Sequence, residues 1–159
     1  MRSILWLIAA LQVALALGGQ PLAAADLPVD LELILAVDVS GSMDIHEQRV
    51  QRAGYMAALM DPGVLRAIAS GYNRRIAITY VEWAGSNIQY IAVPWRLIDG
   101  EASARRFAAA LGDLPYNTYR GTSISGALAF ASGLFAGNGY QGLRRAIDVS
   151  GDGPNNQGI

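Results

Sequence analysis

The stretch LELILAVDVSGS, residues 31–42, decides the fold. Its first seven residues, Leu31 to Val37, are apolar apart from one glutamate, which predicts a strand buried on both faces of a sheet. The strand leads into Asp38, Ser40 and Ser42, whose polar groups are costly to bury unless something binds them. Gly41 permits a tight turn that brings their oxygens together. One carboxylate and two hydroxyls suit Mg²⁺, Mn²⁺ or Ca²⁺ rather than zinc or copper.

The N-terminus has the pattern of a secretory signal. Arg2 precedes an apolar run over residues 4–17, and Ala23-Ala24-Ala25 offers a cleavage site of small residues. The run is shorter than the roughly 20 residues that span a bilayer. We therefore predict a signal peptide over residues 1–25 and one domain over residues 26–159, exported to the periplasm or secreted. An uncleaved anchor is the alternative.

The composition excludes several classes of protein. The 12 basic residues include Arg2, and without it 11 face 13 acidic ones, a net charge of −2 that gives no nucleic-acid surface. The chain has no cysteine, which excludes disulfides, thiol catalysis and thiolate metal sites. It also has no lysine to form a Schiff base or bind phosphate.

The remaining pattern alternates between strands and helices. A capping box, Asp44 with Glu47, predicts a helix to about residue 60. The other predicted helices cover residues 102–111 and 122–135, and the other strands cover residues 76–83, 88–93 (ended by Pro94) and 145–150. The short turn at residues 85–87 makes the middle two strands a hairpin. The predicted fold is α/β and doubly wound, a mostly parallel sheet with one antiparallel edge strand and helices on both faces.

Three loops are expected to meet in one crevice. In such sheets, ligands bind beyond the carboxyl ends of the strands. Asp38, Ser40 and Ser42 follow the first strand, Asp152 follows the fourth, and Thr122 begins the helix that precedes the fourth. These five residues are the predicted metal ligands, with no catalytic residue among them.

At these positions the sequence resembles the von Willebrand factor A-type domain with its metal-ion-dependent adhesion site. That family's pattern is Asp-x-Ser-x-Ser, then a Thr and an Asp on two further loops. Within the family, the stretches at residues 38–44, 81–85 and 148–156 resemble an exported, uncharacterised bacterial branch. The resemblance covers about residues 30–159. Because the family's last helix would follow Ile159, the domain is expected to lack roughly two strand–helix units at its C-terminus.

The resemblance implies a binding module and not an enzyme. Ser40, Ser42 and Thr122 would touch a divalent cation directly, with Mg²⁺ the first choice, while Asp38 and Asp152 would act through water. The cation would keep one open position for an Asp or Glu carboxylate from a protein partner. No nucleic acid and no membrane span after signal removal are expected.

Several alternatives compete with this hypothesis. Asp38, Ser40, Ser42 and Thr122 could serve only as helix caps, and Asp152 only as a turn residue. The Ser40-Gly41-Ser42 loop precedes a helix and could bind phosphate in an extracytoplasmic enzyme, although no phosphate-binding lysine exists. A serine hydrolase is a third possibility, but no Gly-x-Ser-x-Gly elbow is present.

Seven other residues could have either a structural or a functional role. Asp148 is expected to pair with an arginine or cap a backbone group, and His46 to be a solvated surface residue. Glu82 and Trp83 either pack in the hairpin or contact a ligand. Tyr116, Tyr119 and Arg120 either pack in their loop or form a recognition rim.

Overall fold

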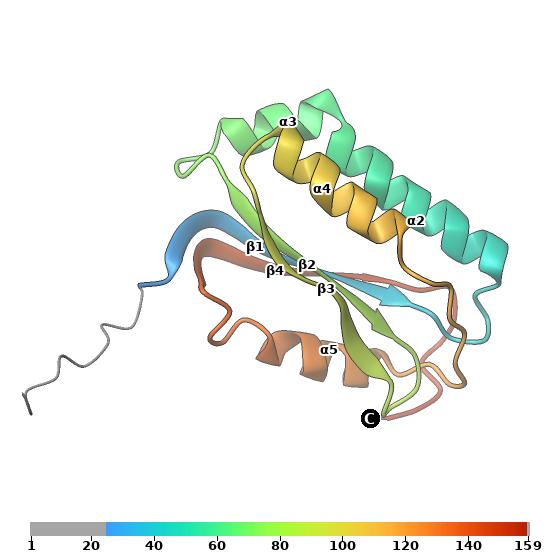
Figure 1. The fold of residues 1–159 in the computed structure, drawn as a ribbon. Helices are drawn as coiled ribbons and strands as arrows, with labels where there is room; N and C mark the ends of the chain where they lie inside the picture. Colours follow the sequence, from blue (N-terminus) through green and yellow to red (C-terminus); the bar gives the residue numbers. More distant parts are fainter. Residues whose placement is uncertain (1–24, 159) are drawn as a thin grey trace, which may run out of the picture.

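A four-stranded sheet forms the centre of the molecule. The computed structural model describes residues 25–158 (Figure 1). The strands are β1 (Leu27–Asp38), β2 (Ile76–Trp83), β3 (Gln89–Ile98) and β4 (Tyr140–Ser150). The helices are α2 (Ile45–Met60), α3 (Pro62–Ala69), α4 (Glu101–Gly112) and α5 (Ile124–Gly133). The predicted signal peptide lies outside the described residues, apart from Ala25.

The sheet has the order β3-β2-β1-β4. β1 runs parallel to both β2 and β4, while β2 and β3 are antiparallel. This confirms the predicted fold class, including the antiparallel edge strand. The register places Asp38 beside Trp83 of β2, and Val37 beside Ser150 of β4. The end of β1 is therefore flanked by the carboxyl ends of two parallel neighbours.

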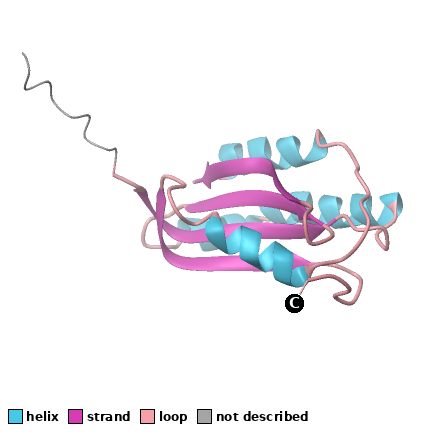
Figure 2. Cartoon of the chain, turned by 90° about the horizontal axis from the view of Figure 1, so that it is seen from below, coloured by secondary structure: helices cyan, strands magenta, loops and turns pink. Residues whose placement is uncertain are grey.

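Helices cover both faces of the sheet. In Figure 1, α2, α3 and α4 lie on one side, and α5 lies alone on the other. Figure 2 views the molecule from below and shows α5 lying across this face of the sheet. The larger core cluster, which includes Leu35, Tyr80 and Phe107, lies against the three helices. The smaller one, which includes Ile34 and Trp83, lies against α5. Because consecutive side chains of β1 point to opposite faces, the residues from Leu33 to Val37 contribute to both cores, and this part of the strand is wholly apolar.

Three strand boundaries differ from the prediction, the first being that β1 begins at Leu27 and not at Leu31. β3 was expected to end at Pro94 but continues to Ile98. Pro94 is tolerated because β3 is an edge strand, where a missing backbone N–H breaks no bond to an outer neighbour. β4 was expected to begin at Arg145 but begins at Tyr140, within a glycine-rich segment predicted as loop. Pairing of Tyr140 with Leu27 of the longer β1 overrides the poor strand propensity of that segment.

The predicted capping box forms. Asp44 accepts a hydrogen bond from the Glu47 amide at 2.8 Å, and the Glu47 side chain accepts one from the Asp44 amide at 2.8 Å. α2 therefore begins at Ile45 with its cap supplied by Asp44, which leaves the residues of the preceding loop free for another role. Within residues 25–158, no helix is both long and apolar enough to cross a membrane.

Candidate functional site

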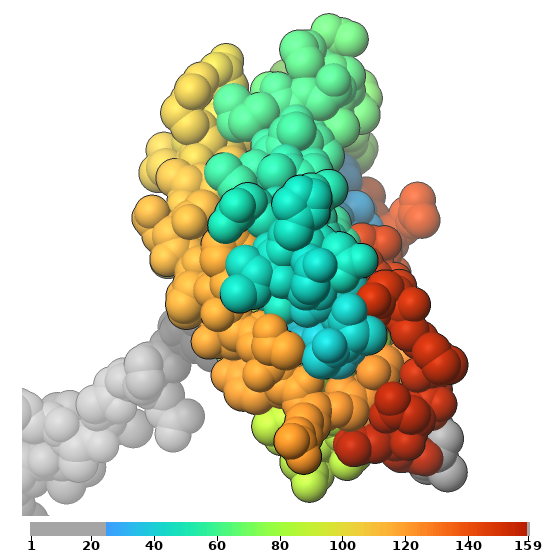
Figure 3. Space-filling view, turned by 90° about the vertical axis from the view of Figure 1, so that its right-hand side faces the viewer, coloured from blue at the N-terminus to red at the C-terminus, as the bar shows by residue number. Residues whose placement is uncertain are grey.

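The five predicted ligands come from three loops at one end of the sheet. Asp38 ends β1, with Ser40 and Ser42 in the loop after it, Thr122 lies just before α5, and Asp152 lies just after β4. Figure 3 views this end of the molecule. The start of α2, the segment before α5 and the segment after β4 lie side by side there, in cyan, orange and red. The predicted convergence of the loops is therefore observed.

A chain of hydrogen bonds joins four of the five residues. The Ser40 amide donates to Asp38 Oδ1 at 2.7 Å. Ser42 Oγ donates to Asp152 Oδ1 at 2.8 Å and lies 2.9 Å from Ser40 Oγ. Since the Ser42 hydrogen points at Asp152, the Ser42 oxygen accepts from Ser40. The two loops after β1 and β4 are thus linked side chain to side chain, across 110 residues of sequence.

Asp38 is the residue of the cluster whose burial costs the most free energy. Its side chain is fully buried, and its Oδ2 atom has no hydrogen-bond partner among the described residues. Burial raises the pKa of Asp38, and the negative charge of Asp152 raises it further, while the hydrogen bonds from Ser40 oppose the shift. A buried carboxylate oxygen with no partner is unfavourable, so a cation or a hydrogen-bond donor bound at this atom would stabilise the fold.

Thr122 is available because another residue caps α5. The alternative role of Thr122 as helix cap is wrong: Ser123 is the cap, and its side chain accepts from the Gly126 amide at 3.1 Å. Gly153 lies between the Thr122 and Ser42 side chains. A Cβ added at Gly153 would lie 3.4 Å from Ser42 Oγ and 4.0 Å from Thr122 Oγ1. Thr122 therefore faces the same small space as Ser42.

Three of the five residues are buried and two are exposed. Asp38, Ser40 and Thr122 form the buried floor, whereas Ser42 and Asp152 are open to solvent. Gly151 is required by close approach, because a Cβ there would lie 2.9 Å from Asp38 Oδ2. The cluster therefore has a buried, fixed base and a solvent-exposed side, and a site for an external ligand needs both.

The segment after Asp152 clamps the Thr122 loop, and sequence reasoning missed this role. Asn156 Oδ1 accepts from the Thr122 amide at 2.9 Å, and the Asn156 and Gln157 amides donate to the Thr122 carbonyl at 2.9 and 3.1 Å. Asn155 Oδ1 accepts from the Ile124 amide at 2.8 Å. The run of two asparagines and a glutamine beside a predicted ligand was the available signal.

A buried ion pair holds the other side of the Thr122 loop. Arg52 of α2 lies 3.2 Å from Glu82 of β2, and the side chains are 3% and 2% exposed. The same guanidinium donates to the Leu114 and Pro115 carbonyls at 2.7 and 3.1 Å, and lies 4.1 Å from the ring centre of Tyr116. Glu82 is thus a structural residue rather than a ligand contact. No pattern in the sequence predicted this pair.

The remaining predicted positions have modest roles. Among residues 25–158, Asp148 pairs with neither an arginine nor the backbone, and instead accepts a hydrogen bond from the Tyr55 hydroxyl at 3.0 Å. His46 is exposed, as expected. It lines, with Met43, Val50 and Asp152, an open groove of about 480 Å³ beside the cluster. This groove leaves space next to Asp152 for part of a larger ligand.

The cluster fits a hard divalent cation. Its five side chains offer only oxygen atoms, three hydroxyls and two carboxylates, and one of the carboxylate oxygens is buried without a partner. Within the described residues, no group of three or more His, Cys, Asp or Glu side chains is placed to hold a metal. The fit therefore depends on serine and threonine hydroxyls, which suit Mg²⁺ better than zinc.

A family model matches residues 28–159 of the chain. The chain belongs to the family described as "Protein of unknown function (DUF1194)". This agrees with the predicted resemblance to a family without an assigned function. No curated protein matches the chain.

Two similar solved structures come from the type V pili tip protein Mfa5 of Porphyromonas gingivalis. One contains three N-terminal domains and is 14% identical, with a TM-score of 0.47, covering 75% of this chain and 19% of that one. The other is the vWF domain, 16% identical with a TM-score of 0.47, covering 75% of this chain and 36% of that one. The chain thus spans about a fifth and about a third of their lengths.

Proposed function

We propose that Asp38, Ser40, Ser42, Thr122 and Asp152 bind a divalent cation, Mg²⁺ in the first instance, and that the protein is a metal-dependent binding module. The single observation that carries the proposal is the Asp38 Oδ2 atom, which is buried without a partner in the described part of the chain, beside hydroxyls of its own loop, Ser40 and Ser42, and of the Thr122 loop. A cation would supply the missing positive charge and neutralise the repulsion between Asp38 and Asp152.

The proposed ligand is a carboxylate from a protein partner. A cation held by two carboxylates and three hydroxyls keeps much of its charge and attracts a further anionic oxygen. The exposure of Ser42 and Asp152, and the open groove beside them, give a partner access. The module itself contributes no catalytic residue to this interaction.

The phosphate-binding alternative has less support. The Ser40 and Ser42 hydroxyls are directed to each other and to Asp152, not to a space that an anion could fill. Two carboxylates beside the loop would repel a phosphate group.

The proposal includes export from the cytoplasm, since the pattern of residues 1–25 is that of a secretory signal. N-terminal sequencing of the protein recovered from outside the cytoplasm tests this part. We expect a chain that begins at Asp26. Recovery only from the cytoplasm with Met1 in place would contradict it.

A peptide-display selection tests the binding function. The protein is immobilised with Mg²⁺, peptides of random sequence are captured, and bound ones are eluted with EDTA. We expect the eluted peptides to share an Asp or Glu, and expect Glu→Gln or Asp→Asn changes in them to abolish binding.

The matched control is Asp148→Asn, which removes a carboxylate of the preceding strand, β4, that accepts a hydrogen bond from Tyr55 and is not part of the cluster. Asp152→Asn should lose the selected peptides and Asp148→Asn should retain them. Peptides that bind equally well in EDTA, or that lack an acidic residue, would refute the proposal.

A further inference from the structure

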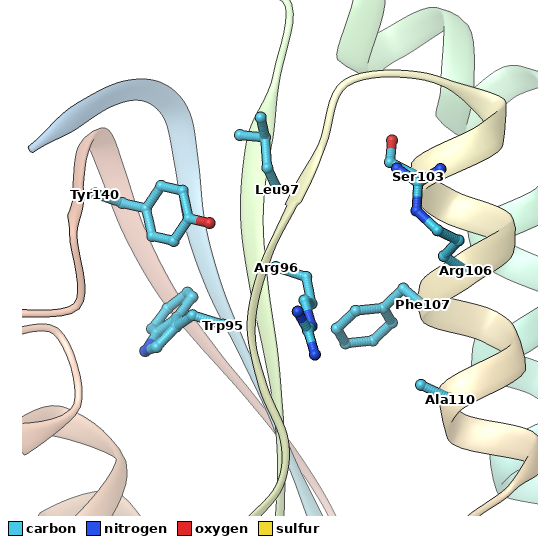
Figure 4. Close-up of a pocket in the computed structure, with 8 residues that line it drawn as sticks. All are labelled: Trp95, Arg96, Leu97, Ser103, Arg106, Phe107, Ala110 and Tyr140. Atoms are coloured by element: carbon cyan, nitrogen blue, oxygen red, sulfur yellow. The ribbon is translucent and has the colours of Figure 1, made fainter.

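A second cavity lies far from the five-residue cluster, over the free edge of the sheet. Its volume is about 490 Å³, which is ample for a small organic molecule. Figure 4 shows it astride β3, with Trp95 and Tyr140 on one side and residues of α4 on the other. Its lining includes Trp95, Arg96, Ser103, Arg106 and Tyr140.

The charge of this cavity is positive. Arg96 and Arg106 both line it, and no acidic side chain does. Within residues 25–158, the ion pairs are Arg52–Glu82, Arg105–Glu101 and Arg145–Glu32, so neither of the two lining arginines has an acidic partner there. Two unpaired guanidinium groups at one cavity favour an anion, above all a carboxylate, which matches the fork of an arginine.

One wall of the cavity is aromatic and fixed in place. The Trp95 indole donates to the Leu134 carbonyl at 3.2 Å. Its ring lies 6.1 Å from that of Phe135 and 6.3 Å from that of Tyr140. An aromatic wall that is already held by its neighbours offers a flat apolar surface without further loss of side-chain freedom. Such a surface suits the apolar face of a ring-shaped ligand.

The floor of the cavity is the edge of a strand. β3 has β2 on one side only, so the outer side of its backbone over Trp95 to Leu97 carries N–H and C=O groups without a strand partner. The Tyr140 hydroxyl also points toward β3 in Figure 4. The Ser103 hydroxyl is already engaged with Asp99 and Gly100, so it contributes shape only. These free polar groups suit a ligand with hydroxyls of its own.

We infer that this cavity binds an acidic sugar. Each group of a uronic acid has a matching part of the cavity. Its carboxylate would bind Arg96 and Arg106, the face of its ring would pack on Trp95, and its hydroxyls would bond to the edge of β3. The site is independent of the proposed cation site, because no residue is shared between them.

Nuclear magnetic resonance of the intact protein tests this inference, with D-glucuronate as the probe. The readout is the indole N–H signal of Trp95, with that of the buried Trp83 as reference. We expect a saturable shift of the Trp95 signal with glucuronate and none with D-glucose at equal concentration. No shift with glucuronate, or an equal one with glucose, would overturn the inference.

Two variants and a second probe sharpen the test. Arg106→Gln should weaken glucuronate binding at least tenfold, whereas Arg105→Gln, the next residue of α4, should leave it unchanged because Arg105 pairs with Glu101 away from the cavity. Equal effects of the two variants would contradict a specific role for Arg106. Benzoate, a ring-shaped carboxylate without hydroxyls, should bind more weakly than glucuronate, and tighter binding of benzoate would overturn the assignment to a sugar.

Discussion

The burial of a single side chain, that of Asp38, is an unfavourable contribution to the stability of the molecule. It follows the apolar residues of β1 that build both cores, and its own carboxylate lies at the bottom of the cluster with one oxygen unpartnered among the described residues. Without a cation, this group lowers the free energy of unfolding, because the unfolded chain solvates the charge and the folded chain does not. The proposed binding site and a structural weakness therefore coincide at one side chain.

Asp38→Asn should stabilise the cation-free protein at neutral pH. The folded-state pKa of Asp38 is raised, so the stability associated with its protonated form is lost as the pH rises through that pKa. An amide keeps the acceptor for the Ser40 amide and carries no charge. Thermal unfolding in EDTA at pH 7 should show a midpoint a few degrees higher for the variant. A lower midpoint would mean that the buried charge is already compensated.

At the scale of elements, the site depends on segments that contribute no ligand. Asn156 and Gln157 hold Thr122 from one side, and Arg52 of α2 holds the preceding loop from the other. Second-layer partners of this kind commonly change metal affinity by tenfold or more without touching the metal. The two sets of contacts are separate, so each can be removed by its own substitution.

Asn156→Ala should weaken Mg²⁺ binding about tenfold. It removes the acceptor of the Thr122 amide, and should lower the free energy of unfolding by only about 1 kcal/mol. Asn155→Ala is the matched control, because its side chain serves Ile124 instead. Cation titration and urea unfolding of both variants provide the measurement. Equal losses of affinity would show that the clamp acts as a whole and not through Thr122.

Arg52→Met should destabilise the protein by about 3–5 kcal/mol, since it leaves the buried Glu82 without its cation. The double variant Arg52→Met/Glu82→Gln should recover a large part of that loss. Arg49→Met, one turn earlier on α2 and exposed, should change little. Urea denaturation measures all three, and a double variant no more stable than Arg52→Met would disprove the account of this pair.

At the scale of the whole molecule, the sequence predicts the architecture better than the boundaries. The buried strand at residues 31–37, the hairpin and the capping box were all predictable, because each has a local pattern with a physical cause. The extension of β3 beyond Pro94 and of β4 back to Tyr140 was not, since both depend on which strand lies alongside.

The candidate site was likewise predictable from the sequence only in part. Four of its polar residues follow the ends of strands and the fifth, Thr122, precedes a helix, so all five could be named from the sequence. The buried Arg52–Glu82 pair and the Asn156 clamp instead connect residues far apart in the chain. Nothing local to these residues reveals their partners. The cavity beside β3 was also hidden, because it forms only where α4 and the ring of Tyr140 approach the edge strand.

The alkaline stability of the molecule should reflect its half-buried tyrosines. Burial, with a contribution from Asp148, raises the pKa of Tyr55 to about 12 from its usual 10. Since the unfolded chain releases this proton first, stability is lost as the pH rises from about 10 to about 12. Tyr55→Phe should make the loss over that range smaller in urea titrations. An unchanged slope would assign it to other groups, such as Tyr80 and Tyr90, whose pKa values burial also raises.

Isothermal titration calorimetry of Mg²⁺, with Mn²⁺ and Ca²⁺ in parallel, tests the central claim most directly. The protein, the Asp38→Asn variant and the Asp148→Asn control are titrated under identical conditions. The account predicts saturable binding of one cation, lost in Asp38→Asn and retained in Asp148→Asn. Absence of binding by the folded protein, or equal binding by Asp38→Asn, would contradict it and leave the three loops with a purely structural role.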